Sequence, residues 1–289
     1  MLMEERYGTG EEKLAHYTCH RTPGPLVVDG NLDKEAWKTA PRSRRFVDLV
    51  TGEPGFLETR MAALWDERAL YVGFWIEEPR LRASFKKRDS YIWFDNDVEV
   101  FIAGDDCYYE LELNAFNTVY EVFFIYQDAL KRGSRFDRPE FDLYTRDVDV
   151  LSGFQDACRN GKHPRGKRWA FMDWDFPGLQ TAVKVEGRIN DPGSVDKGWT
   201  VELAFPWEGM RGLFADRLLP PKEGDVLRAA FFRFEALRYN GRAATESAAW
   251  ALNEHGVYDS HIPECFSYLH FVESAAARPS PEGGTGQDP

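Results

Sequence analysis

The stretch from Ser90 to Tyr126 carries residue types that could hold a neutral polar ligand. Trp93 precedes Glu99, and Glu112 and Asn114 follow after a polar turn. Carboxylate and amide groups make directional hydrogen bonds to hydroxyls, while an aromatic face offers rigid area for stacking against C–H groups. These residues therefore indicate a binding site for a molecule such as a sugar.

Two strands must position these side chains. Apolar and polar residues alternate over residues 97–102 and, after the turn at 104–106, again over residues 108–114. A period of two on both sides of a short polar loop predicts an antiparallel hairpin with an apolar face toward the core. The opposite face carries Glu99, Glu112 and Asn114. Two alternatives stay open: Trp93 as a core residue, and the carboxylates as a solvated sheet face.

Metal-binding patterns are weak in this chain. The run Asp95-Asn96-Asp97 resembles part of a calcium loop but lacks the glycine and distal glutamate that an EF-hand requires. The four cysteines are scattered without metal-ligand spacing, and free thiols are expected. The sequence therefore assigns no metal ligands.

The rest of the chain reads as many short strands separated by turn signals. We expect these strands at residues 26–28, 59–65, 69–77, 118–126, 179–190, 198–205, 226–237, 249–252 and 266–272, with helical turns at 32–40 and 206–211. The pattern predicts an all-β fold, an antiparallel β-sandwich of jelly-roll type with short helical turns and one long insertion. We expect a flexible arm over residues 1–15, the sandwich over 16–273 with an irregular insertion at 128–174, and a disordered tail over 274–289.

Composition narrows the classes of partner. Aromatic residues make up 15% of the chain, which suits a sandwich, and the net charge of −12 argues against nucleic acid or an anionic membrane. No apolar run is long enough for a membrane span, and no signal peptide is visible. As written, the chain would be cytoplasmic.

A set of motifs in fixed order resembles a known family. VDGNLDKEAW, LWDERALYVGF, DNDVEVFI, YYELELNAFNTVYE, GLQTAV, GWTVELAFPW and a closing HIPECF occur between Thr18 and Val272. Together they resemble the family 9 carbohydrate-binding modules, in particular bacterial family-9-like proteins. The resemblance implies a β-sandwich of jelly-roll type that binds sugar with loops and one sheet face.

The resemblance also implies roles for individual residues. In the family a sugar lies between two aromatic rings, and a glutamate bonds its hydroxyls. Trp93 and Glu99 match the first ring and this glutamate, while Tyr258 and His261 occupy the region of the second ring. Arg233 lies where another polar contact is expected. Glu112 stands where characterised members have an arginine, which leaves the ligand preference open. Family members can also hold structural calcium, although no cofactor is required, and many are exported, which leaves the compartment open.

The sequence features are compatible with three functions. The leading hypothesis is non-catalytic carbohydrate binding associated with polysaccharide breakdown, with a mono- or oligosaccharide as partner and no catalytic residue. One alternative is a glycoside hydrolase that uses Glu99 and Glu112 across neighbouring strands. The other is a protein-interaction module that uses the insertion at residues 128–174.

Overall fold

Strands make up most of the chain in the computed structural model, which describes residues 7–22, 24, 26–152, 161–239, 242–243 and 247–273. Fourteen strands form one continuous sheet. They are β1 (His16–Arg21), β2 (Val47–Asp48), β3 (Thr59–Trp65), β4 (Ala69–Glu77), β5 (Asp97–Ala103), β6 (Cys107–Asn114), β7 (Val119–Tyr126), β8 (Val148–Leu151), β9 (Arg168–Phe171), β10 (Gln180–Glu186), β11 (Gly198–Pro206), β12 (Val226–Glu235), β15 (Ala248–Ala251) and β16 (Ser267–Val272).

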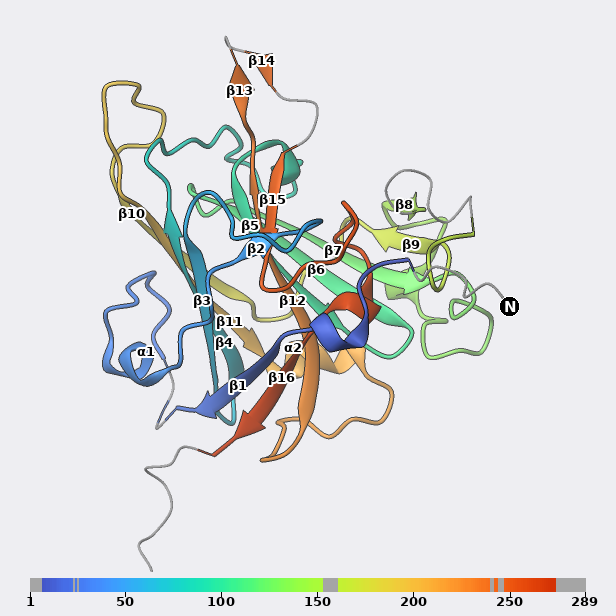
Figure 1. The fold of residues 1–289 in the computed structure, drawn as a ribbon. Helices are drawn as coiled ribbons and strands as arrows, with labels where there is room; N and C mark the ends of the chain where they lie inside the picture. Colours follow the sequence, from blue (N-terminus) through green and yellow to red (C-terminus); the bar gives the residue numbers. More distant parts are fainter. Residues whose placement is uncertain are drawn as a thin grey trace, which may run out of the picture.

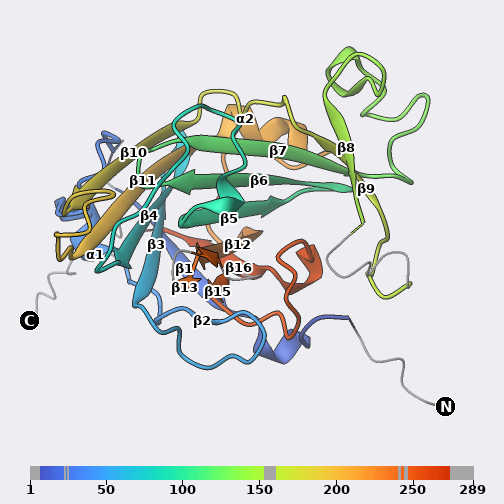
Figure 2. The same cartoon turned by 90° about the horizontal axis from the view of Figure 1, so that it is seen from above.

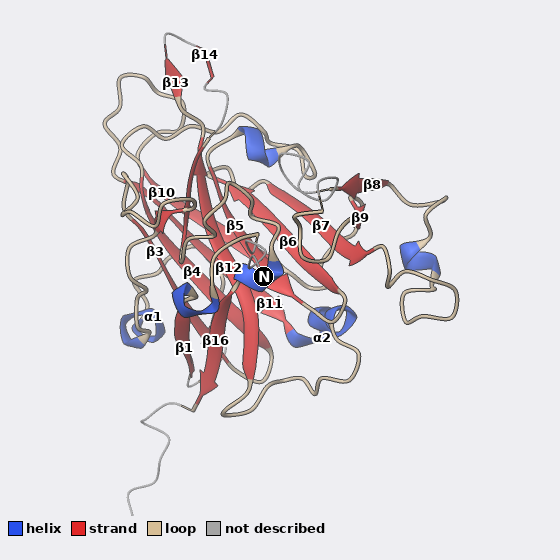
Figure 3. Cartoon of the chain, turned by 45° about the vertical axis from the view of Figure 1, so that its right-hand side comes forward, coloured by secondary structure: helices blue, strands red, loops and turns tan. Residues whose placement is uncertain are grey.

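Helical structure in the described residues is limited to short turns between strands (Figure 3). A separate two-stranded hairpin joins β13 (Arg238–Tyr239) to β14 (Arg242–Ala243). The helical segments are η1 (Glu11–Lys13), α1 (Glu35–Thr39), η2 (Ile92–Phe94), η3 (Pro139–Phe141), α2 (Trp207–Met210), η5 (Arg211–Leu213) and η6 (Pro263–Cys265).

The large sheet folds over on itself to form two layers around one core (Figure 2). Its strand order is β10-β11-β4-β3-β1-β16-β12-β5-β6-β7-β9-β8, and β15 pairs with β12 and β2. Tyr109 of β6 packs edge-on against Phe205 of β11, and Phe74 of β4 contacts Phe231 of β12. Inward-facing apolar residues of both layers belong to one buried cluster. The all-β sandwich that the sequence predicts is confirmed.

The strand nearest the N-terminus, β1, lies between β3 and β16 in the sheet, a position that the sequence did not predict. β1 lies beside β16, near the opposite end of the chain, and pairs with it in parallel (Figure 1). It also pairs in parallel with β3, whereas the other strand pairs of the large sheet are antiparallel. The antiparallel prediction therefore fails at β1, because that strand joins two segments that are distant in sequence.

Most predicted strands appear within one or two residues of their expected bounds. Residues 26–28, however, form no strand, and β1 was missed. Residues 128–174 were predicted to be irregular, but β8 and β9 lie within them and extend the sheet beyond β7 (Figure 1). Their strand signal is weak because each strand has only four residues, a run too short for a period of two to stand out.

Residues 7–15, expected to belong to a flexible arm, pack against the body of the protein. The Tyr7 hydroxyl donates to Asp259 Oδ2 over 3.0 Å, and Leu14 is buried with Ile262 and Cys265. Residues 1–6 and the tail at 274–289 lie outside the described part. Cys19 and Cys107 are free and buried, Cys265 is also buried, and Cys158 lies outside the described part. No helix in the described part is long and apolar enough to span a membrane.

Candidate functional site

The β5–β6 hairpin gathers carboxyl groups on one sheet face, the face turned away from the main core. Its register places Glu99 directly opposite Glu112, and Phe101 opposite Glu110. Residues on this face alternate with core residues such as Val98 and Val100, which belong to the main buried cluster. The face is covered rather than solvated: Glu99 and Glu112 are 3% exposed and Glu110 is 4% exposed.

A cavity of about 530 Å³ opens over these carboxyl groups. Its charged lining residues come from β5, β6 and β8. They are Glu99, Glu110, Glu112 and Asp149. Its aromatic lining comes from η2, β7, β12 and the segment before η6. These rings are Trp93, Phe94, Tyr120, Phe124, Phe234 and Tyr258, and His261 completes the wall. A concave site with apolar walls and a few converging polar groups is typical of small-molecule binding.

Trp93 is the aromatic residue best placed to act as a platform. Its side chain is 36% exposed and lines the cavity. It stacks on Tyr91 with ring centroids 4.5 Å apart and meets Tyr120 edge-on at 5.1 Å. These two neighbours already hold the indole in place. A ligand that stacks on the ring therefore loses little further side-chain entropy by ordering it. Trp93 is therefore not the buried core residue of the alternative interpretation.

Burial changes the protonation of the carboxyl groups. Desolvation raises the pKa of Glu99 and Glu112 well above the ordinary range, and neighbouring carboxylates raise both pKa values further. Desolvation also raises the pKa of Glu110, to about 8. The interaction between Glu110 and Glu112 lowers the pKa of Glu110 and raises that of Glu112, so Glu112 is the more readily protonated of the two. The cluster thus holds protons at neutral pH.

His261 and Tyr258 both lie in the cavity wall. His261 Nδ1 lies 3.1 Å from the Tyr108 hydroxyl, and its Nε2 lies 3.9 Å from Glu110 Oε1. Desolvation lowers the pKa of His261 well below its ordinary value, so the imidazole is neutral. The Tyr258 hydroxyl donates to Ser247 O over 2.9 Å, which fixes the ring against Phe234.

Asn114 and Arg233 were expected in the site, but the structure does not bring them into the cavity lining. The Asn114 amide donates to Phe85 O and Asp95 Oδ2, and its oxygen accepts from the backbone of the following turn. Arg233 pairs with Val98 in register and therefore points to the core side of the sheet. There it bonds Glu235 at 2.9 Å and lies over the Trp250 ring.

Several lining residues were not predicted. Glu110 lies two residues before Glu112, so the strand period could have identified it. Tyr120 and Phe234 lie in predicted strands, but their aromatic character did not distinguish the cavity from the core. Asp149 and Met172 come from the stretch at 128–174, where no strand was expected.

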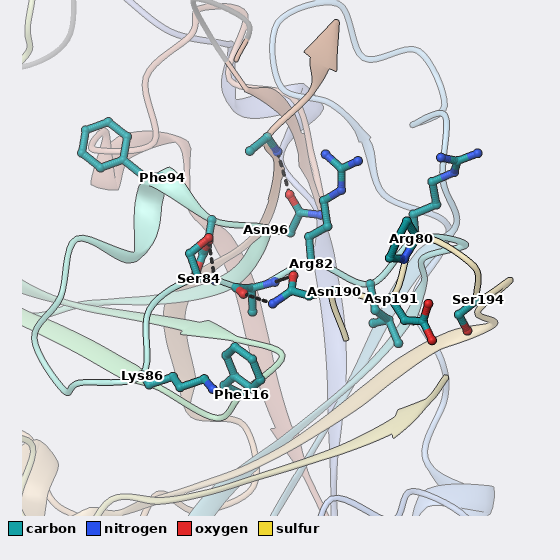
Figure 4. A pocket seen from close by; sticks show the side chains of 15 residues that line it. Arg80, Arg82, Ser84, Lys86, Phe94, Asn96, Phe116, Asn190, Asp191 and Ser194 are labelled. Carbon is teal, nitrogen blue, oxygen red and sulfur yellow. Dashed lines mark hydrogen bonds between the residues drawn. The ribbon is translucent and has the colours of Figure 1, made fainter. Parts of the chain in front are cut away.

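A second cavity, of about 650 Å³, borders the first and shares Phe94 and Ala236 with it. Figure 4 shows Arg80, Arg82 and Lys86 around it, with Lys86 beside the Phe116 ring. Its acidic residues are occupied: Asp95 accepts from the backbone of Ser84 and Phe85, and Asp191 pairs with Arg188. This groove is basic, whereas the first cavity is acidic.

Calcium, which the resemblance allows, has no cluster of acidic side chains to hold it in the described part of the chain. Within the described residues, no group of three or more His, Cys, Asp or Glu side chains could hold a metal ion. Glu99, Glu110 and Glu112 lie close together but do not provide such a geometry. No role in the site is therefore derived for a metal.

Comparison with known proteins supports the fold. No family profile matches the chain, and no curated protein matches it. A candidate carbohydrate-binding protein from Bacteroides uniformis superposes with a TM-score of 0.52 at 14% identity, over 90% of this chain and 98% of that one. A family 9 carbohydrate-binding module from Caldicellulosiruptor kristjanssonii in complex with cellotriose gives 0.49 at 13% identity, over 93% and 99%. At this identity, the first likeness establishes the fold alone.

Proposed function

We propose that this protein is a non-catalytic carbohydrate-binding protein, in which a sugar ring stacks on Trp93 and bonds to Glu99 and Glu112. The observation that carries the proposal is an exposed Trp beside buried carboxyl oxygens in one cavity. Glu99 Oε2 and Glu112 Oε2 are buried and have no hydrogen-bond partner among the described residues. Buried polar atoms without partners are costly, and a ligand that bonds to them removes the cost.

The cavity suits the chemistry of a sugar. Its volume of about 530 Å³ is within the usual range for small-molecule sites. A pyranose ring presents C–H groups on its faces and hydroxyls at its edge. Trp93 would meet one face, while the carboxyl groups below would bond the hydroxyls with directions that distinguish epimers.

The carboxyl groups favour binding over hydrolysis. A retaining glycosidase needs one ionised carboxylate as nucleophile and one protonated acid, so the two environments must differ. Here desolvation raises the pKa of both Glu99 and Glu112. Neither residue is held in the ionised form that a nucleophile requires.

The stretch at residues 128–174 takes part in the same site. β8 contributes Asp149 and Val150 to the cavity wall, and β9 contributes Ala170. We assign this stretch to sugar binding in preference to contact with a protein partner. The biological role we propose is the capture of sugars released or exposed during polysaccharide breakdown.

The experiment is a calorimetric titration of the full chain with glucose, cellobiose, xylo-oligosaccharides and galactose, with Trp93→Ala in parallel. At least one sugar should bind, and Trp93→Ala should weaken its binding at least about tenfold, or about 1.4 kcal/mol. The same mixtures are assayed for released sugar. Absence of binding to every sugar, or product formation that depends on Glu99 or Glu112, would contradict the proposal.

A further inference from the structure

We infer that the sugar bound in this cavity carries a positively charged amine, so that the site selects an amino sugar over the matching neutral sugar. This inference rests on the proposed function and specifies its ligand. The grounds are the acidic residues of the lining, the buried carboxyl oxygens that have no hydrogen-bond partner in the described part of the chain, and the lack of a lysine or arginine among the described lining residues.

Every charged lining residue of the cavity is acidic. Glu99, Glu110 and Glu112 form its floor, and Asp149 lies exposed on β8. Among the described residues, neither lysine nor arginine lines the cavity. Asp97, two residues before Glu99 on the same strand face, adds a further buried carboxyl behind the wall. Each of these groups becomes negative when it loses its proton, so the described lining can offer a ligand charge of one sign only.

The buried oxygens match the bonding needs of an ammonium group. Glu99 Oε2, Glu112 Oε2 and Asp97 Oδ2 have no partner among the described residues. A protonated amine has three N–H donors and no acceptor, so it suits a floor made of carboxyl oxygens. Such charge-assisted hydrogen bonds are shorter and stronger than those to a neutral hydroxyl.

A bound cation would change the protonation of the cluster. In the empty cavity, burial and the mutual effect of four carboxyl groups on neighbouring strand positions keep them protonated. An ammonium group beside them would lower their pKa values and favour an ionised carboxylate opposite the cation, whereas a neutral hydroxyl has no such effect. The aromatic walls add favourable contacts between the cation and Trp93 or Tyr120.

The basic side chains around the cavity have other partners. The charge of Arg168 lowers the pKa of Glu110, but Arg168 does not line the cavity. Its guanidinium donates to the Tyr108 hydroxyl at 3.0 Å, Gly166 O at 2.9 Å and His261 O at 3.2 Å. Arg80, Arg82 and Lys86 line the neighbouring groove (Figure 4). That groove shares Phe94 and Ala236 with the acidic cavity. The acidic cavity therefore lacks an internal cation among the described residues.

The test compares three sugars that differ at one position: glucose, glucosamine and N-acetylglucosamine. Each is titrated into the full chain at about pH 6.5, where an amine with an ordinary pKa near 8 is protonated. Glucosamine should bind at least tenfold more tightly than glucose. N-acetylglucosamine should lose that gain, because acetylation removes the charge.

Variants tie the selectivity to the carboxyl groups. Glu112→Gln keeps the shape of the side chain and should bring the ratio of glucosamine to glucose affinity toward one. Asp149→Asn alters an exposed residue, so it tests the same charge without risk to folding. Glu35→Gln is the matched control, since it removes one negative charge from α1, where the side chain is 85% exposed, and should leave the ratio unchanged.

The outcomes separate the two proposals. Equal affinity for glucose and glucosamine, with both lost in Trp93→Ala, would overturn the amine inference and leave the sugar site standing. An unchanged ratio in both Glu112→Gln and Asp149→Asn would also overturn it. If none of these sugars, nor the neutral oligosaccharides, bound the parent protein, the proposed function would fail and the inference with it.

Discussion

Burial gives the carboxyl groups of the cavity a protonation behaviour that surface carboxyls lack. Desolvation raises the pKa of Glu110 from an ordinary 4.5 to about 8. Between these values the folded chain holds a proton at Glu110 that the unfolded chain has lost. The free energy of unfolding contributed by this group is therefore largest below pH 4.5 and declines as pH rises toward 8.

Glu110→Gln tests this directly. Without its sugar, the parent protein should lose stability between about pH 5 and 8 relative to Glu110→Gln, by at most about 1.4 kcal/mol per pH unit for one proton. Urea unfolding at several pH values measures the difference. Parallel curves for the two proteins over this range would show that Glu110 is ionised in the fold.

Arg233 shows that a polar residue on a binding strand can serve the structure alone. Its guanidinium bonds Thr59 Oγ1 at 3.0 Å and Glu235 at 2.9 Å, with Glu78 at 3.9 Å, and it is fully buried. Removing it would leave these carboxyl groups without their cation. Such losses typically cost about 3–5 kcal/mol.

We therefore expect Arg233→Ala to lower the free energy of unfolding by an amount of this order while the folded fraction binds sugar with unchanged affinity. Arg42→Ala is the control, because Arg42 is exposed and its cation lies over the Trp75 ring, a contact worth about 1 kcal/mol or less. If Arg233→Ala kept its normal stability but lost sugar binding, Arg233 would have to be part of the binding site.

At the scale of elements, the strands that line the cavity differ in burial, and we expect them to differ in local stability against opening. β6 is buried along its whole length, whereas β8 is an edge strand with exposed residues. Amide exchange should accordingly be slowest in β6 and fast in β8. A ligand that contacts Asp149 and Val150 would hold β8 against the sheet.

Hydrogen exchange with and without a bound sugar measures this. We expect protection to rise in β8 and β9 and in residues 91–94, with little change in residues 80–86 beside the basic groove. The opposite distribution, with protection confined to residues 80–86, would move the site to that groove.

At the scale of the whole molecule, sequence reasoning succeeded where a single local period governs the structure. The β5–β6 hairpin follows directly from alternation, which also placed Glu99 and Glu112 on one face, and β4 alternates in the same way. The parallel pairing of β1 with β16 brings together opposite ends of the chain, so no local pattern could reveal it. β8 and β9 likewise depend on the neighbouring edge of β7.

The burial of the carboxyl face could not be predicted from a local pattern either. Alternation shows which side chains share a face but not whether solvent reaches it, since that depends on segments distant in sequence such as the one carrying Tyr258 and His261. For the same reason Arg233 could be placed near the site but not on its correct side. Charge was informative only for the whole chain: a net −12 does not reveal that an acidic cavity and a basic groove lie side by side.

The most direct test of the central claim is a crystal structure of the protein with a bound sugar, soaked at several concentrations. The account predicts a sugar ring within about 4 Å of the Trp93 indole, with hydroxyl or amine groups bonded to Glu99 and Glu112. A sugar ordered among Arg80, Arg82 and Lys86, or anywhere else with the Trp93 cavity empty, would contradict it.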